Sequence, residues 1–532
     1  MSFRVLPNAS RRVGMVIATG ALLVASGVPA YADDPQAPPP FRLSGFAAEG
    51  RGHGQATVPI SGAAVVSAAT LAATTVSAGP NVDVNAGGSD ATIQSPIGGV
   101  TVNSCFPGKE TPQDETTIAV SPVDAAILVA GANDYRLYEP SENRYDGSGG
   151  FFRSTDGGAT WMAGLLPGLV RANAIAPGPY EAAGDPSVAA GPNNVFWYAN
   201  LAFNRTDNAN SVAVSRSENG GATWSTSFVL QTSAADGGRV FNDKEWVGAD
   251  PSNGLVAHVT WTQFQTSPSG HTRSSPIVIS NTTDGGAHWS APVRVSPFLY
   301  NQGSVVLVDA TGTIHVTYEA YSRGGDVVAY STSTDGGATF STRVLAAIND
   351  IPSPLPGATF RDYSFPAFAR DGANLHVVWS NWNGTNADVL YIRSTDGGAS
   401  WSSPVAIGGG SGDQFLPWVG SNGGTVFASW SDRPAANDTY SIAGAGSSDG
   451  GASWSAPVAI STATSNVLDG NAFGYPTCAF SFIGDYSGIT VDANGVAHVA
   501  WTDTRRGNDP TDSSTNDTTA DQDVYTATLS IP

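Results

Sequence analysis

The stretch that decides the fold is Ser154-Thr155-Asp156-Gly157-Gly158-Ala159-Thr160-Trp161, because close copies of it recur along the chain. Five further copies begin at Ser217, Thr282, Ser333, Ser394 and Ser447. Their Asp or Asn positions follow one another at intervals of 63, 65, 51, 61 and 53 residues. Such an interval accommodates one four-stranded blade with its loops, so the sequence predicts a β-propeller built from internal repeats.

The motif itself has the chemistry of a hairpin turn. The Asp or Asn can bond to its own backbone, and the paired glycines permit a positive φ. The Ser or Thr hydroxyl adds backbone hydrogen bonds, and the closing Trp or Phe is expected to pack against the blade. We therefore interpret each copy as a structural turn with an aromatic plug rather than as a ligand site.

A second recurring element counts the blades. Segments with alternating apolar residues, each suited to the first strand of a blade, occur seven times, at 116–120, 186–190, 245–249, 304–308, 365–369, 416–420 and 487–491. Seven starts and six motif copies predict an all-β, seven-bladed propeller over residues 96–532. Because the last blade lacks both the motif and a fourth strand, we expect an N-terminal strand near Val100–Val102 to close the ring.

The six copies resemble the Asp-box (BNR) repeats of the sialidase superfamily, and the resemblance covers roughly residues 105–530. It implies the propeller fold. Asp boxes also occur in sortilin-type receptors, xyloglucan hydrolases and non-catalytic propellers, so the activity has to be argued from the site.

The N-terminal region predicts export. Residues 1–32 combine Arg4, Arg11 and Arg12 with a short apolar run and the small-x-small end Ala30-Tyr31-Ala32, which is typical of a secretory signal peptide. Residues 33–95, rich in Pro, Ala, Gly and Thr, are predicted to be a flexible leader outside the ring. In an oxidising compartment the two cysteines, Cys105 and Cys478, are expected to form a disulfide, with two separate buried thiols as the alternative.

The composition excludes several classes of protein. The formal net charge of -21 opposes binding to a phosphate backbone, so no nucleic-acid partner is expected. No apolar segment after the signal region is long enough to span a bilayer. We expect a secreted, soluble protein, a monomer, whose partner is a glycan or glycoconjugate.

Charged residues gather before the first strand of most blades. In a propeller the loops entering strand one lie on the same face, here called the top, as the loops joining strands two and three. The residues expected around the channel mouth are Asp114, Glu115, Asp185, Asp243, Lys244, Glu245, Arg361, Asp362, Tyr363, Asp413, Asp485 and Tyr486. Clustered carboxylates can recruit Ca²⁺, act as general acid and base on a glycan, or bind backbone amides at strand starts, and these three readings stay open.

The resemblance to sialidases implies particular roles. Such enzymes hold an anionic sugar with three arginines and use an Asp acid with a Glu-activated Tyr nucleophile. Blade position implies Arg361, Arg433 and Arg505 for the clamp, Asp243 for the acid, and Tyr486 or Tyr363 with Glu245 for the nucleophile. The Arg-Ile-Pro motif of sialidases is absent from this sequence.

Two functions follow as hypotheses. The leading one is a glycoside hydrolase with its site at the top-face mouth of the channel, acting on a glycan that could be acidic. The other is a non-catalytic binding propeller that uses the same mouth, with calcium as a possible ligand. The sequence indicates no required cofactor.

Overall fold

The computed structural model describes residues 67–72, 74–85, 112–233, 238–322, 324–410, 412–473, 480–505 and 522–532. Residues 37–532 form one compact unit. Its described part is almost entirely β-structure, with two single-turn 3₁₀ helices, η3 (Pro192–Asn194) and η5 (Val467–Asp469). None of the helices described is long and apolar enough to cross a membrane.

The strands form seven antiparallel blades, each a meander in chain order. Blade one contains β4 (Gln113–Val120), β5 (Leu128–Glu139), β6 (Arg144–Ser154) and β7 (Met162–Leu165). Blade two contains β8 (Ala182–Ala190), β9 (Phe196–Phe203), β10 (Asn210–Ser217) and β11 (Ser225–Thr232). Blade three contains β12 (Val240–Ala249), β13 (Ala257–Thr266), β14 (Thr272–Ser274), β15 (Ile277–Thr282) and β16 (Val293–Arg294). Blade four contains β17 (Asn301–Val308), β18 (Ile314–Ser322), β19 (Gly325–Ser333) and β20 (Ser341–Ile348).

Blade five contains β21 (Ala367–Asp371), β22 (Asn374–Trp382), β23 (Ala387–Ser394) and β24 (Val405–Ala406). Blade six contains β25 (Asp413–Asn422), β26 (Thr425–Arg433), β27 (Thr439–Ser447), β28 (Val458–Ala459) and β29 (Ser465–Asn466). The seventh blade contains β32 (Gly488–Val491), β33 (Ala497–Asp503) and β34 (Asp523–Ser530). A separate hairpin, β30 (Asn471–Phe473) and β31 (Phe480–Phe482), precedes it.

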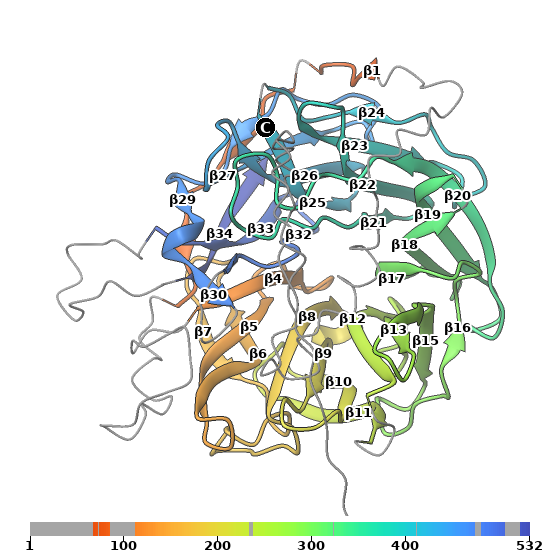
Figure 1. Ribbon diagram of the computed structural model, residues 1–532. Helices are drawn as coiled ribbons and strands as arrows, with labels where there is room; N and C mark the ends of the chain where they lie inside the picture. The colour runs from red at the N-terminus through yellow and green to blue at the C-terminus, as the bar shows by residue number, and fades with distance from the viewer. Residues whose placement is uncertain are drawn as a thin grey trace, which may run out of the picture. The chain divides into compact units, whose positions relative to one another are not determined.

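The first strands of the blades line the centre of the ring (Figure 1). Each of β4, β8, β12, β17, β21, β25 and β32 contacts the next, and β32 contacts β4 again. The predicted seven-bladed propeller is therefore confirmed, and the segments leading into these strands all come to one face of the ring.

An N-terminal segment completes the seventh blade, as predicted, but with different residues. β2 (Ser77–Ala78) and β3 (Val82–Asp83) pair with the outer edge of β34. Before them, β1 (Ser67–Ala68) pairs with β24, and Leu71 pairs with Trp454. The segment predicted to fill this position, Val100–Val102, lies outside the described residues. Residues 67–72 and 74–85, predicted as part of a leader outside the ring, contribute β1, β2 and β3 to the sheets of the ring. Unpaired outer strand edges accept any extended segment, so composition alone does not show which stretch docks there.

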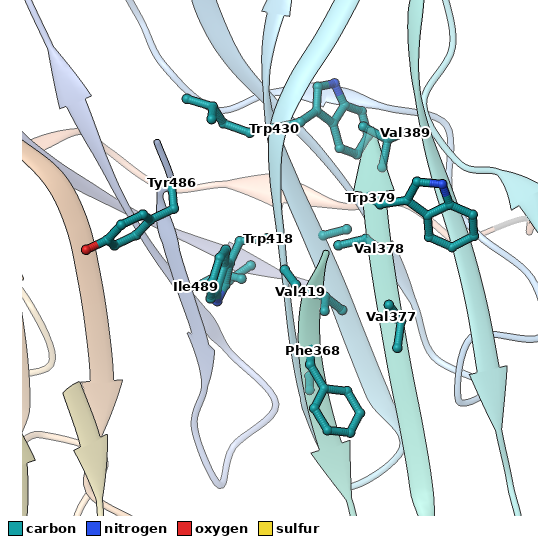
Figure 2. Close-up of a cluster of buried hydrophobic side chains, with 14 of the residues drawn as sticks. Phe368, Val377, Val378, Trp379, Val389, Trp418, Val419, Trp430, Tyr486 and Ile489 are labelled. Atoms are coloured by element: carbon teal, nitrogen blue, oxygen red, sulfur yellow. The ribbon is translucent and has the colours of Figure 1, made fainter. Parts of the chain in front are cut away.

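The six Asp boxes form the hairpins between the third and fourth strands, as expected. In the first, the backbone N–H groups of Gly158 and Thr160 donate to Ser154 Oγ (2.9 Å) and Asp156 Oδ1 (2.9 Å). Trp197, Trp261, Trp379, Trp430 and Trp501 lie fully buried on the second strands. Figure 2 shows Trp379 and Trp430 packed among the valines of blades five and six. This packing supports the rigid inner strands that carry the site.

Four sequence predictions fall outside the described residues: the signal peptide of residues 1–32, the remainder of the leader, the closing strand near residues 100–102, and both cysteines of the expected disulfide.

Candidate functional site at the channel mouth

A repeated backbone irregularity shapes the starts of the inner strands. In five blades the pairing of strand one with strand two shifts register near its start. At each shift one residue has a positive φ between 51° and 67°: Glu115, Asp185, Lys244, Gly303 or Leu416. A bulge of this kind redirects side chains that strict alternation would send to opposite faces. Left-handed conformations of residues other than Gly carry strain and concentrate at functional sites.

Asn133 on β5 forms hydrogen bonds with acidic residues of both blade one and blade two. Asn133 donates from Nδ2 to Asp114 Oδ1 at 2.9 Å and to Glu115 Oε2 at 2.8 Å. Its Oδ1 accepts the backbone N–H of Asp185 at 2.9 Å. Burial, followed by the charges of Asp185 and Asp485, raises the pKa of Glu115 well above its usual range. Asn133 thus fixes three acidic residues beside one another.

Arg361 brings the seventh blade into the same cluster. Its guanidinium forms a two-pronged ion pair with Asp485, with Nε donating to Oδ1 at 2.8 Å. The backbone N–H of Asp485 donates to Glu115 Oε1 at 3.2 Å. The Arg361 guanidinium also lies over the Phe482 ring, 4.6 Å from its centre. The arginine therefore holds one carboxylate and neutralises part of the acidic charge.

Asp185 and Asp243 form the solvent-facing pair of the mouth. Both residues are partly exposed, whereas Glu115 and Asp485 have exposed fractions of 2% and 8%. The backbone N–H of Lys244 donates to Asp185 Oδ2 at 2.9 Å. Burial raises the pKa of Asp243 well above its usual range, and the charge of Asp185 and a hydrogen bond with it act in the same direction. Gln302 Nε2 lies 3.5 Å from Asp243 Oδ2.

Lys244 sits beneath this pair on an aromatic floor. Its Nζ lies 3.1 Å from the centre of the Tyr486 ring and 5.1 Å from that of Trp246. Burial lowers the pKa of Lys244, while Glu115, Asp185 and Asp485 act to raise it. Trp246, Trp418 and Tyr486 contact one another, with Trp246 and Trp418 ring centres 4.8 Å apart. Tyr486 and Trp418 are drawn in Figure 2.

The expected pairing of Tyr486 with Glu245 is not formed. The Tyr486 hydroxyl donates to the backbone carbonyl of Pro186 at 2.9 Å. Both Glu245 carboxylate oxygens are buried and have no hydrogen-bond partner within the described chain. Burial raises the pKa of both groups and so favours the neutral form of each. Tyr363, the other candidate, is partly exposed and lies 5.6 Å from the Arg361 guanidinium.

The three arginines expected to form one clamp are paired with three different carboxylates. Arg433 is fully buried and donates to Asp413 Oδ2 at 2.6 Å and to the carbonyls of Asn437 and Pro356. Arg505 pairs with Asp503 on β33. Only Arg361 faces the acidic cluster. The expectation of a three-arginine clamp was wrong, because loop residues close in sequence or on the neighbouring strand satisfy the other two side chains.

Asp362 and Asp413 belong with Arg433 rather than with the mouth. Asp362 accepts the backbone N–H of Leu355 at 2.7 Å, and burial raises its pKa to about 7. Asp413 also accepts the backbone N–H of Ala387 at 3.1 Å. Both acids therefore accept hydrogen bonds from backbone N–H groups, which is one of the three roles that the sequence left open for the acids before the first strands.

A possible cation position lies apart from these clusters. The side chains of Glu319, Asp326 and Asp350 in blade four each bring one carboxylate oxygen within 4.8 Å of the others. Asp350 is exposed and the other two are partly exposed. Oxygen ligands suit Ca²⁺, but three acids at a surface satisfy that requirement only in part.

Sequence reasoning missed the residues that organise the mouth. Asn133 lies on β5, the second strand of blade one, outside the strand-one entries that the sequence singled out. Phe482, which supports Arg361, lies on a hairpin that the repeat pattern does not contain. No spacing signal in the sequence distinguishes either residue.

The fold and the mouth define an Asp-box β-propeller with an acidic, aromatic-floored channel mouth. The chain belongs to the BNR repeat-like domain family, whose model matches residues 195–479. This confirms the predicted resemblance.

Similar proteins include glycan-acting enzymes. The chain is 29% identical over 304 residues to a xyloglucanase of Paenibacillus sp., covering 54% of this chain and 26% of that protein. It is 26% identical over 301 residues to the xyloglucanase Xgh74A of Acetivibrio thermocellus, and this match covers 54% of this chain and 32% of that protein. The chain thus spans between a quarter and a third of the length of these relatives. Among solved structures, the Hadza microbial sialidase Hz136 aligns with a TM-score of 0.43 at 12% identity over 87% of this chain and 98% of that one.

Proposed function

We propose that this protein is a glycoside hydrolase whose active site is the channel mouth. The observation that carries the proposal is the pair Asp185 and Asp243: two partly exposed carboxylates side by side, one of them with its pKa raised. Hydrolysis of a glycosidic bond generally requires one protonated carboxylic acid and one ionised carboxylate flanking that bond. The similarity to xyloglucanases supports the same class of reaction.

Within this proposal Asp243 is the general acid. Its raised pKa favours the protonated form that a general acid needs. Asp185 is the partner carboxylate, because it lies beside Asp243 and is held in place by the backbone N–H of Lys244. The side-chain amide of Asn133 accepts the backbone N–H of Asp185, and that of Gln302 lies beside the Asp243 carboxylate, so the two amides position the two acids.

The charge of the mouth favours a neutral glycan over an acidic one. Five acids, Asp114, Glu115, Asp185, Asp243 and Asp485, face two cations, Lys244 and Arg361. Arg361 is already paired with Asp485, and the other two arginines of the expected clamp are paired elsewhere. A sugar carboxylate would therefore meet repulsion without a free guanidinium, whereas neutral hydroxyl groups can donate to the carboxylates.

The test is hydrolysis by the wild-type protein and by Asp243→Asn. We expect release of reducing ends from xyloglucan or another neutral glycan, no release from sialosides, and at least a hundredfold loss in Asp243→Asn. The rate of the wild-type protein should fall as the pH rises through the pKa of Asp243. Asp388→Asn, a partly exposed top-face acid of blade five, is the matched control and should keep its activity.

The second candidate is a non-catalytic glycan-binding propeller. It is favoured by the burial of Glu115, Lys244 and Asp485, which leaves few groups of the cluster open to a substrate. Retention of a glycan without turnover would support it, and dependence of that retention on added Ca²⁺ would assign the role of calcium. Export from the cell remains a prediction of residues 1–32.

A further inference from the structure

A second hollow lies on the top side of blade one, away from the channel mouth. It is a depression open to solvent with a volume of about 430 Å³, and its lining includes Tyr138, Glu139, Ser141, Arg171, Ala172 and Ala174. Glu139 ends β5, and Arg171 lies in the segment between β7 and β8. The volume is within the range of pockets that hold small ligands.

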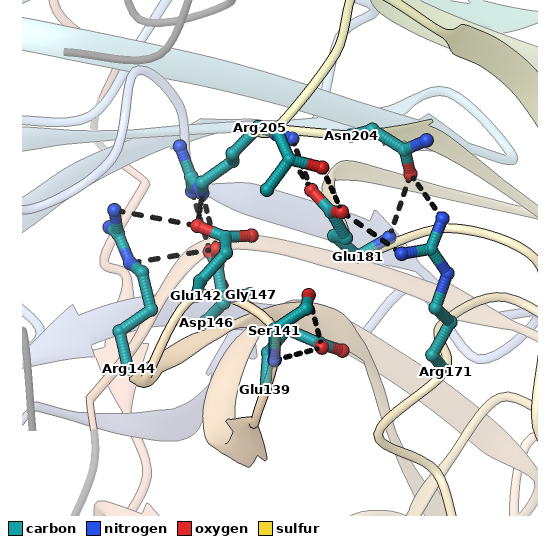
Figure 3. A network of polar contacts seen from close by, with 11 residues as sticks. Glu139, Ser141, Glu142, Arg144, Asp146, Gly147, Arg171, Glu181, Asn204 and Arg205 are labelled. Carbon is teal, nitrogen blue, oxygen red and sulfur yellow. Dashed lines mark hydrogen bonds and ion pairs between the residues drawn. The ribbon is translucent and has the colours of Figure 1, made fainter. Parts of the chain in front are cut away.

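One carboxylate oxygen in this hollow has no donor. Glu139 Oε1 accepts both the backbone N–H (2.9 Å) and the hydroxyl (2.6 Å) of Ser141, whereas Oε2 is buried and has no hydrogen-bond partner in the described chain. Figure 3 shows the Glu139 carboxylate directed towards the space between Ser141 and Arg171. The residue has an exposed fraction of 3%. A buried acceptor left without a donor costs free energy, which a hydroxyl-bearing ligand would recover.

The charges around the hollow argue against an ionic ligand. Arg171 donates to Glu181 Oε1 at 2.9 Å and to the carbonyl of Pro179 at 2.9 Å, so its charge is matched. Glu139 repels an anion, and the Arg171 guanidinium repels a cation. The partly exposed Tyr138 ring is held edge-on to Tyr145, with the ring centres 5.8 Å apart, and offers an apolar face.

The ion-pair partner of Arg171 lies close in sequence to the channel mouth. Glu181, the partner of Arg171, immediately precedes β8, and Asp185 lies four residues further along the chain. At about 3.3 Å per residue the two positions are roughly 13 Å apart. A glycan of several units bound at Asp185 could therefore extend to the hollow.

We propose that this hollow is a second sugar-binding subsite, taking one neutral, hydroxyl-bearing unit of a longer glycan. The unit stacks on Tyr138 and donates a hydroxyl hydrogen to Glu139 Oε2. The choice of glycan rests on the proposed function, but the binding itself does not require turnover.

The experiment measures the affinity of the full chain for xyloglucan and for cellohexaose by isothermal titration, in an Asp243→Asn background that prevents hydrolysis. Tyr138→Ala is expected to weaken binding about five- to tenfold, as loss of a central aromatic contact does. Glu139→Gln retains an oxygen for Ser141 but presents an amide N–H₂ to the hollow, and is expected to weaken binding by a similar factor. Tyr321→Ala, which removes an exposed aromatic of blade four, is the control.

The outcomes separate the two proposals. Weaker binding in both hollow variants, with unchanged hydrolysis of a short aryl glycoside in the otherwise wild-type chain, supports the subsite. Should the protein hydrolyse no glycan, the titrations still report on the subsite. Affinities equal to that of the control variant overturn it, as does tighter binding of a sulfated than of a neutral glycan. If Tyr138→Ala lowers the melting temperature, Glu139→Gln decides.

Discussion

Replacing Arg361 by Met tests whether the acidic cluster depends on a single cation. The Arg361 side chain is 22% exposed and that of its partner Asp485 is 10% exposed. Met keeps much of the side-chain volume over Phe482 but removes the charge. Asp485 would then lose its direct ion pair and face Glu115 and Asp185 with Lys244 as the remaining cation of the cluster.

The expected magnitude follows from the burial of the pair. Removing one partner of a buried ion pair costs about 3–5 kcal/mol, and the remaining exposure of Arg361 places this pair at the lower end, about 3 kcal/mol. An unfolding entropy of roughly 2.1 cal/mol/K per residue, over the roughly 420 residues from Gln113 to Pro532, gives about 0.9 kcal/mol/K. The melting temperature should therefore fall by about 3 °C at pH 7.5.

Differential scanning calorimetry at pH 7.5 provides the assay. The double variant Arg361→Met with Asp485→Asn should lose less than the single Arg361→Met variant, because no charge is left unpaired. Glu218→Gln, which breaks an ion pair whose acid is 71% exposed, is the control and should cost less than about 1 kcal/mol. If Arg361→Met costs no more than this control, or the double variant loses the sum of both single effects, the reasoning is refuted.

Two further predictions concern stability against pH. Burial and the neighbouring Asp146 raise the pKa of Glu142 to about 8, so the folded protein keeps a proton that the unfolded chain releases above its ordinary pKa of 4.5. Stability should fall as the pH rises from about 5 to 8, by at most about 4 kcal/mol from this group, and Glu142→Gln should flatten that fall in calorimetric melting curves. In the Asp box of blade four, hydrogen bonds from Thr339 lower the pKa of Asp335 to about 2. Its contribution is present above the unfolded pKa and disappears as the pH falls towards 2, so Asp335→Ala should lower the melting temperature at pH 7 and not at pH 2; an equal loss at both would contradict this.

The sequence predicted the fold because its signals are local. Each Asp box is a turn whose hydrogen bonds lie within eight residues, such as those of Ser154 and Asp156, and its spacing counts the blades. The starts of the first strands could also be identified from the sequence. Because a closed ring brings these starts to one face, Glu115, Asp185, Asp243 and Asp485 were expected to lie at one mouth.

The assignment of partners could not be predicted in the same way. Arg433 and Arg505 lie at or just after the ends of second strands, whereas Arg361 precedes a first strand, and only Arg361 pairs with a carboxylate of the mouth. The register shifts at Glu115, Asp185 and Lys244 decide which side chains face inward, and no repeat marks them. Likewise, several unpaired outer strand edges could have accepted an N-terminal segment, and the sequence does not show that residues 77–78 and 82–83 take the position beside β34.

By itself the sequence determined an Asp-box propeller, its number of blades and the acidic character of one face, because turn chemistry and strand periodicity depend on neighbouring residues. The tertiary structure alone decided which acids have a raised pKa, which arginine lies at the mouth and where the N-terminal segment docks. Each of these depends on burial and on contacts between residues up to several hundred positions apart, such as Arg361 with Asp485 and Glu115 with Asp485.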